Sequence, residues 1–176
     1  MGWVKHHTTN MLVFDIMQFF LLLNHQVLSS ILDKASFDPK VSIFFQNYLV
    51  GRKTKYLWNS FSSPFFDIDI GVGQGSALLP ILSTLYLLFI FHIFEKHLKI
   101  LKIPISLLSF VDDGLLIPQD NSNAILFCSY NVISNLLIKI GLIMEHGKTE
   151  VFYFSRSQGI FDPSPLNLTP LEGSVL

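Results

Sequence analysis

The sequence has little cysteine and almost no net charge. Its one cysteine, Cys128, excludes an internal disulfide and is typical of a reducing compartment. Twelve basic residues stand against 13 acidic ones, for a formal net charge of -1. The chain therefore lacks the overall basic excess of a nucleic-acid binder, so any such binding must be local.

Apolar residues are abundant. Half of the 176 residues are hydrophobic, 17 are phenylalanine, and the mean hydropathy is +0.47. Residues 77–94 carry no formal charge, which meets the length rule for a membrane-spanning helix. A helix buried on all sides of a core has the same composition, and Pro80, Ser83, Thr84 and His92 interrupt the run. Taken alone, this segment leaves a small integral membrane protein open as an alternative.

Strand-like and helix-like segments alternate along the chain. Asn24 and Asp38-Pro39 are typical helix starts, and Gly51 is a typical stop. The segment 59–64 has turn chemistry between two strand-like runs and predicts a hairpin. We expect strands at 11–14, 53–58, 65–70, 105–111, 114–117 and 150–154, and helices at 23–34, 39–49, 77–99 and 121–143.

Two adjacent carboxylates, Asp112 and Asp113, follow an apolar strand in Phe110-Val111-Asp112-Asp113. Like charges side by side are costly when half buried, and a divalent cation would relieve that cost. The alternative is that the two aspartates only shape a tight turn, because Asp tolerates the backbone angles that turns need.

Three other places carry polar chemistry. Asp15 ends the first strand, where a lone acid is most often a helix cap or a turn residue. Gly71-Val72-Gly73-Gln74-Gly75-Ser76 precedes a helix and would let the backbone approach a phosphate or base, although a simple strand-to-helix loop reads the same way. Lys148 would by default be a solvated charge beside a strand.

Together these places resemble the palm of reverse transcriptases. Residues 14–20, Phe-Asp-Ile-Met-Gln-Phe-Phe, are similar to the first palm motif, residues 71–78 to the second, and Phe110 to Asp113 to the third. Gly141-Leu142, followed by Lys148-Thr149-Glu150 and a strand, resembles the fourth. The motifs occur in the family's order across residues 11–156, and the likeness is to non-LTR, LINE-like retrotransposons, including fungal lineages.

The resemblance implies an α/β (α+β) palm, with an antiparallel sheet carrying the catalytic carboxylates and helices packed on one face. It implies RNA-directed DNA synthesis from dNTP on an RNA template and a DNA primer, with two Mg²⁺ ions, or Mn²⁺, and no membrane. Asp15 and Asp112 would bind the metals and Asp113 would support them. Lys148 would be the catalytic acid for pyrophosphate. Phe20, Gln74, Gly75 and Ser76 would contact the nucleotide and the templating pair.

The resemblance also sets expectations for the domains. Residues 1–10 would belong to the fingers side, 11–156 to the palm and 157–176 to a loose tail, with the fingers and thumb of a longer polyprotein missing. Leu21, Leu22 and Gly73 depart from the family's pattern. We expect such a fragment to be inactive by itself, because it lacks the cations that grip nucleic acid, and a non-catalytic retrotransposon remnant is the alternative. An expressed protein would be intracellular, in the nucleus or the cytoplasm.

Overall fold

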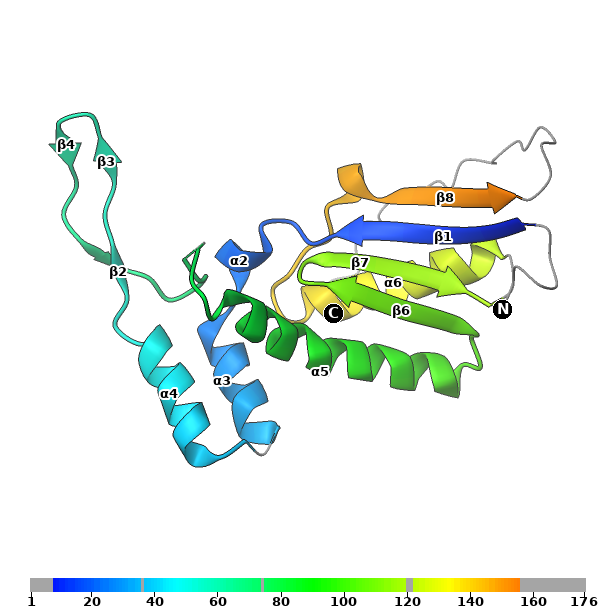
Figure 1. Cartoon of the computed structure of the whole chain (residues 1–176), viewed down its shortest axis with the longest axis horizontal. Helices are drawn as coiled ribbons and strands as arrows, with labels where there is room; N and C mark the ends of the chain where they lie inside the picture. Colours follow the sequence, from blue (N-terminus) through cyan, green and yellow to red (C-terminus); the bar gives the residue numbers. More distant parts are fainter. Residues whose placement is uncertain (1–7, 36, 74, 120–121, 156–176) are drawn as a thin grey trace.

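A four-stranded antiparallel sheet forms the centre of the fold. The computed structural model describes residues 8–35, 37–73, 75–119 and 122–155, so residues 1–7 and the predicted tail at 157–176 lie outside the described residues. The strand order is β6-β7-β1-β8. The strands are β1 (Thr8–Asp15), β6 (Ile105–Phe110), β7 (Asp113–Pro118) and β8 (Glu150–Ser155). Figure 1 shows them side by side, with the start of β1 and the end of β8 at the same end of the sheet.

One face of the sheet is buried by two helices. Leu12 and Phe14 of β1 and Leu116 of β7 are fully buried, because alternate residues of a strand point to the same face. This face packs against α5 (Leu79–Ile100) and α6 (Asn123–Ile138). The predicted α/β palm, with helices packed on one face of an antiparallel sheet, is confirmed.

Three helices follow β1, namely α2 (Phe19–Leu22), α3 (His25–Lys34) and α4 (Pro39–Leu49). The predicted caps are present: Asn24 Oδ1 accepts from Val27 N at 3.0 Å, and Asp38 Oδ1 accepts from Lys40 N at 2.8 Å. The α2 turn was not predicted, since four residues are too few for helical periodicity to show.

A two-stranded arm links α4 to α5. Its ladders are β2 (Lys53–Thr54) with β5 (Phe66–Asp67), and β3 (Leu57–Trp58) with β4 (Phe61–Ser62). The predicted turn at 59–64 is wrong in extent, because Asn59 adopts φ 51° and closes the tip with two residues, Asn59 and Ser60. The arm projects away from the sheet (Figure 1).

The predicted helix over 121–143 is also too long. α6 ends at Ile138, and Leu142 N donates to Leu137 O at 3.0 Å after Gly141 takes φ 81°. The left-handed glycine turns the chain out of the helix. The residues that follow return to the sheet, where Met144 forms an antiparallel bridge with Ile16.

Helix α5 covers the segment that raised the membrane question. Among the described residues it is the one helix that is long and apolar enough to cross a membrane, judged by length and composition alone. In the fold one stripe of it is buried in the core, made of Leu82, Ser83, Tyr86, Leu87, Ile90, Phe94 and Leu98. The packing accounts for this stripe as the core side of a helix against a sheet.

Candidate active site

Two neighbouring strands bring the predicted carboxylates together at one end of the sheet. Asp15 ends β1 and Asp113 begins β7, and the two are direct partners in the antiparallel ladder. Cross-strand partners project from the same face. Ile16 N donates to Asp112 O at 3.2 Å, so the backbone of Asp112 touches the residue after Asp15. Asp15, Asp112 and Asp113 therefore meet where the sheet ends.

The turn that carries Asp112 has an unusual backbone. Phe110 pairs with Asp113 across a two-residue turn, and Val111 takes φ 57° in that turn. A β-branched residue in the left-handed region is a strained outlier of the kind found at functional sites. The left-handed position belongs to Val111, so turn geometry alone does not explain the two aspartates.

Burial and like charges act on Asp112. The pKa of the Asp112 carboxyl is raised, first by burial and then by the negative charges of Asp15 and Asp113, while Lys148 opposes the shift. Each of these raising effects disfavours the charged form. The carboxylates are thus close enough to repel one another, and a cation between them would remove the repulsion.

Lys148 is paired with Asp15. It ends η1 (His146–Lys148), and its Nζ donates to Asp15 Oδ2 at 2.6 Å. The bond Glu145 N to Asp15 O, at 2.9 Å, holds the preceding residues against the end of β1. The hydrogen bond to Asp15 raises the pKa of Lys148, so the lysine keeps its proton. Its side chain is largely exposed but is an ion-pair partner and not a merely solvated charge.

The glycine-rich loop docks on the segment that follows Asp15. Val72 N donates to Phe20 O and Gly71 N to Leu23 O, both at 2.7 Å, and His25 Nε2 lies 2.7 Å from Gly71 O. Gly71 has φ 80°, and a Cβ there would lie 2.8 Å from Leu21 O. Only glycine allows this approach. The backbone of Phe20 therefore connects the carboxylate end of β1 to the loop.

The second half of the loop is partly fixed by α4. Tyr48 Oη donates to Ser76 Oγ at 2.7 Å, so the Ser76 hydroxyl is tied into the fold. Gly75 has φ 89°, and a Cβ there would meet open space. Gln74 lies outside the described residues. The structure thus brings Gly75 and Ser76 onto one loop, with Gly75 facing an open side.

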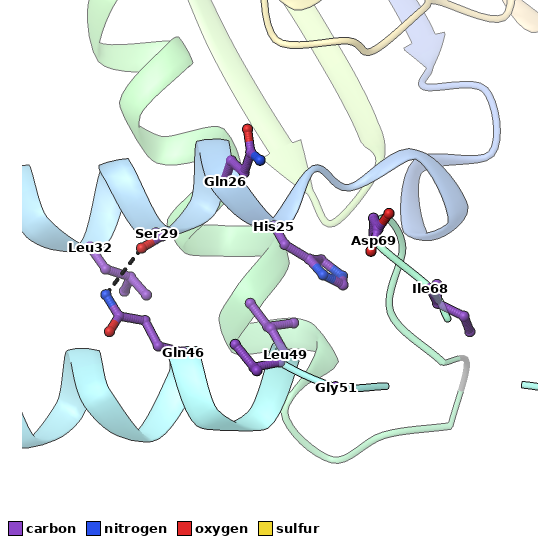
Figure 2. A pocket seen from close by; sticks show the side chains of 10 residues that line it. His25, Gln26, Ser29, Leu32, Gln46, Leu49, Gly51, Ile68 and Asp69 are labelled. Carbon is purple, nitrogen blue, oxygen red and sulfur yellow. Dashed lines mark hydrogen bonds between the residues drawn. The ribbon is translucent and has the colours of Figure 1, made fainter. Parts of the chain in front are cut away.

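A cavity of about 410 Å³ lies behind this loop, away from the carboxylates. Figure 2 shows its walls: His25 and Ser29 come from α3, Gln46 from α4, and Asp69 from the end of the arm. The dashed bond joins Gln46 Nε2 to Ser29 Oγ at 3.0 Å. Of the predicted site residues that the structure describes, none lines this cavity.

Sequence reasoning missed three residues that contact the loop. His25 hydrogen-bonds Gly71, Tyr48 hydrogen-bonds Ser76, and Arg52 lies against Gly73, where a Cβ would be 3.1 Å from its Nη2. Tyr48 lies within the predicted helix 39–49 and has no polar sequence signal, and neither has His25. The basic run Arg52-Lys53-Thr54-Lys55 was a signal for Arg52.

The carboxylate oxygens of Asp15 and Asp112 are the kind of ligand that hard divalent cations prefer. Carboxylate oxygens are the ligands that Mg²⁺ takes from proteins, usually one or two of them with waters and phosphates. Within 8–35, 37–73, 75–119 and 122–155, no group of three His, Cys, Asp or Glu side chains has a metal-binding arrangement. Besides burial, the charge of Asp15 raises the pKa of Asp112, so these two carboxylates lie close to one another. Because Lys148 also binds Asp15, a cation bound to Asp15 would share its oxygens with the lysine. The two carboxylates can hold a divalent cation whose other ligands are water, or phosphate oxygens when substrate is bound.

Solved structures with the same fold include telomerases. Telomerase from Candida tropicalis, in complex with a TWJ fragment of telomeric RNA, is 16% identical with a TM-score of 0.67, covering 83% of this chain and 26% of that one. Apo telomerase from the same organism is 18% identical with a TM-score of 0.65, covering 82% and 28%. Telomerase from Candida albicans, with the same type of RNA fragment, is 17% identical with a TM-score of 0.56, covering 86% and 29%. The chain spans little more than a quarter of the length of these proteins, and the likeness shows the fold.

A comparison with curated proteins finds no match. A protein-family model described as reverse transcriptase (RNA-dependent DNA polymerase) matches residues 3–169. This match includes the carboxylates, the glycine-rich loop and Lys148. The chain belongs to the reverse transcriptase (RNA-dependent DNA polymerase) family.

Proposed function

We propose that this chain is a reverse transcriptase palm that adds a nucleotide from dNTP to the 3′-hydroxyl of a primer on an RNA template. The observation that carries the proposal is the meeting of Asp15 and Asp112 at one end of the sheet, where burial first, and then the charges of Asp15 and Asp113, raise the pKa of Asp112. Family membership supports the reaction class.

Asp15 and Asp112 hold the metal in this proposal, and Asp113 adds negative charge beside them. Two Mg²⁺ ions, or Mn²⁺, supply the chemistry of activating a hydroxyl and neutralising a triphosphate when they are bound. The chain's own part is to present carboxylate oxygens at the end of the sheet, where the ladder between β1 and β7 pairs Asp15 with Asp113. Asp112 lies beside them in the turn that contains Val111, and its carbonyl oxygen accepts from Ile16 N.

Lys148 is the proton donor to the departing pyrophosphate. The hydrogen bond from its Nζ to Asp15 Oδ2 keeps it charged and within the site before substrate arrives. The Lys148 ammonium, placed between Asp15 and a phosphate oxygen, would then be within reach of the leaving group. The raised pKa supports a lysine that enters the reaction protonated.

The loop side of the site receives the nucleotide. Gly75, with open space at its Cβ position, allows close approach of a sugar or base, and Gln74 and Ser76 flank it. Phe20 packs edge to face on Phe19, with ring centroids 5.3 Å apart, and its backbone carries the loop. Its ring is the candidate that sterically rejects a 2′-hydroxyl.

We also propose the wider context. Residues 11–156 form the palm. The surfaces that bind the triphosphate and the primer–template duplex belong to the fingers and thumb of a longer polyprotein. That polyprotein is encoded by a non-LTR, LINE-like, fungal-type retrotransposon. The share of 26–29% of the telomerase chains that this fold covers supports a palm that works with further domains.

Primer extension tests the function. The full chain is incubated with a labelled DNA primer on an RNA template, the four dNTPs and MgCl₂, beside Asp112→Asn and the control Asp33→Asn, an exposed acid on α3. On this proposal the wild type and the control extend the primer, slowly because few cations hold nucleic acid and contrary to the inactivity expected of a fragment, and Asp112→Asn loses on the order of 100-fold, because removing a metal ligand raises the barrier by about 2.7 kcal/mol. Absence of extension in all three would contradict the proposal and favour an inactive remnant.

A further inference from the structure

The densest basic run of the chain lies at the root of the arm. Arg52, Lys53 and Lys55 fall within four residues, in a protein with 12 basic residues overall. Lys53 is offset by Asp67, with Nζ and Oδ1 3.8 Å apart. Arg52 and Lys55 have no carboxylate partner among the described residues, so they carry the positive charge of this surface.

Arg52 has an unsatisfied guanidinium. The group lies over the Tyr48 ring, 5.3 Å from its centroid, and Nη1 is buried without a hydrogen-bond partner in the described part of the chain. Guanidinium is always charged, and a buried nitrogen that makes no bond is costly. Nη2 packs beside the backbone of Gly73. The fold therefore holds a charged guanidinium against the glycine-rich loop at the root of the arm.

Aromatic rings cover the rest of the arm. Trp58 and Phe61 form the tip and are 76% and 62% exposed. Below them Tyr56 and Phe66 have ring centroids 5.2 Å apart, and Lys55 Nζ lies 5.3 Å from the centroid of Phe65. Exposed rings interleaved with cations are the surface on which unpaired bases stack while their phosphates are neutralised.

The root of the arm is connected to the candidate site through the glycine-rich loop. The arm projects from the side of the molecule at which β1 ends and the β6–β7 turn lies, with α2 between it and the sheet (Figure 1). Through Arg52 its root contacts Gly73 of the loop that follows the arm in the chain. A strand bound along the arm would reach the loop directly.

We propose that the arm, residues 52–69, binds single-stranded RNA, with Arg52 and Lys55 contacting phosphates and the rings of Trp58 and Phe61 stacking on bases. An apolar tip alone would suit a protein partner equally. The cations set among the rings, and the unpaired guanidinium at the root, favour a polyanion with aromatic bases. The identification of this RNA as the template depends on the proposed function, whereas RNA binding by the arm does not depend on it.

Fluorescence anisotropy tests the inference with a labelled oligouridylate of about 20 nucleotides, the full chain, and neither metal nor dNTP. Trp58→Ala/Phe61→Ala should weaken binding by about tenfold or more, since each stacked base contributes appreciably. Arg52→Gln/Lys55→Gln should lower the slope of log affinity against log salt by about 1.4, which is two phosphate contacts on a single strand. Lys96→Gln/Lys99→Gln, which removes the same charge from exposed positions of α5, should leave the slope unchanged.

Three results would overturn the inference. The first is that the arm variants bind RNA as tightly as the wild type. The second is that the Lys96→Gln/Lys99→Gln control loses as much RNA affinity as the arm variants, which would mean that RNA is attracted by charge over the whole surface and not by the arm. Alternatively, Trp58→Ala/Phe61→Ala could keep RNA affinity while light scattering shows that it breaks a self-association, which would make the arm a protein interface. Asp112→Asn separates this inference from the proposed function, because it should lose extension and keep RNA binding.

Discussion

Lys148 Nζ lies 2.6 Å from Asp15 Oδ2, so a lysine ammonium already neutralises one of the carboxylates proposed to bind metal. Asp112 forms no ion pair within the described part of the chain, and burial, then the charges of Asp15 and Asp113, raise its pKa. The charge balance of the site is therefore uneven: Lys148 pairs directly with Asp15 and acts on Asp112 only through its charge. This difference makes Lys148 both the proposed proton donor and a competitor for the metal.

Lys148→Met should therefore tighten divalent-cation binding while it lowers primer extension. Removing the ammonium frees Asp15 Oδ2 for the ion but takes away the proposed acid. Calorimetric titration with MnCl₂, together with extension rates, measures both effects. Lys139→Met, an exposed lysine after α6, is the matched control. Unchanged metal affinity in Lys148→Met would show that the pair does not compete with the cation.

Gly114→Ala should destabilise the fold by about 3 kcal/mol, because overpacking a tight core site forces its neighbours to move. A Cβ at position 114 would lie 2.0 Å from Phe14 Cζ, and Phe14 is fully buried beneath the carboxylate turn. Urea unfolding measures the effect. Gly147→Ala, whose Cβ would be 3.7 Å from the Glu145 side chain, is the control.

A double variant sharpens this test. Phe14→Leu removes the ring that the new Cβ would meet, so Phe14→Leu/Gly114→Ala should lose less stability than the two single changes added together. Strictly additive losses would mean that Gly114 is required for its backbone and not for the room it leaves to Phe14.

How far the sequence predicted the fold depends on how local each signal was. Asn24, Asp38 and Pro39 predicted two helix starts, because a cap acts on the next turn of its own helix. The ends at 59–64 and 121–143 were wrong, since a left-handed Asn59 or Gly141 stops an element without changing the apolar pattern. Asp15, Asp112 and Asp113 could be predicted as site residues because the order of the palm motifs is visible in the sequence. The Lys148–Asp15 pair, and Arg52 beside Gly73, are contacts between distant segments that spacing cannot predict.

Tyr48→Phe should cost about 1 kcal/mol, the usual net value of one neutral hydrogen bond. Ser76→Ala should cost more, because Ser76 Oγ also accepts from Leu78 N at 3.3 Å, and the double variant should cost about the same as Ser76→Ala alone. The shared bond between Tyr48 Oη and Ser76 Oγ explains the expected coupling. Unfolding in urea measures the cycle, and KM for dNTP in primer extension should rise in all three variants. A double variant with the sum of both losses would show that the bond does not hold the loop.

Stability should fall at high pH because of Tyr86. Burial raises the pKa of Tyr86 to about 12, while its hydroxyl donates to Ile140 O at 3.0 Å. An unfolded tyrosine ionises near pH 10. The stabilisation from the protonated, buried hydroxyl is thus complete below about pH 10 and is lost between about pH 10 and 12, by about 1.4 kcal/mol per pH unit.

Tyr86→Phe should remove this part of the pH dependence. Burial also raises the pKa of Tyr130, so the variant should show a smaller fall and not a flat profile. Tyr56→Phe, an exposed tyrosine of the arm, should keep the wild-type profile. The measurement is the free energy of unfolding in urea at a series of pH values, and an identical slope in Tyr86→Phe would rule out Tyr86 as its source.

Asp15 and Asp112 share a divalent cation in the proposed site. Calorimetric titration of the full chain with MnCl₂, without nucleic acid, measures this directly for the wild type, Asp15→Asn, Asp112→Asn and the control Asp33→Asn. We predict binding by the wild type and the control, and affinity at least about tenfold weaker in both site variants, since each removes one of the few protein ligands such ions take. Equal affinity in all four proteins, or binding by none of them, would contradict the account.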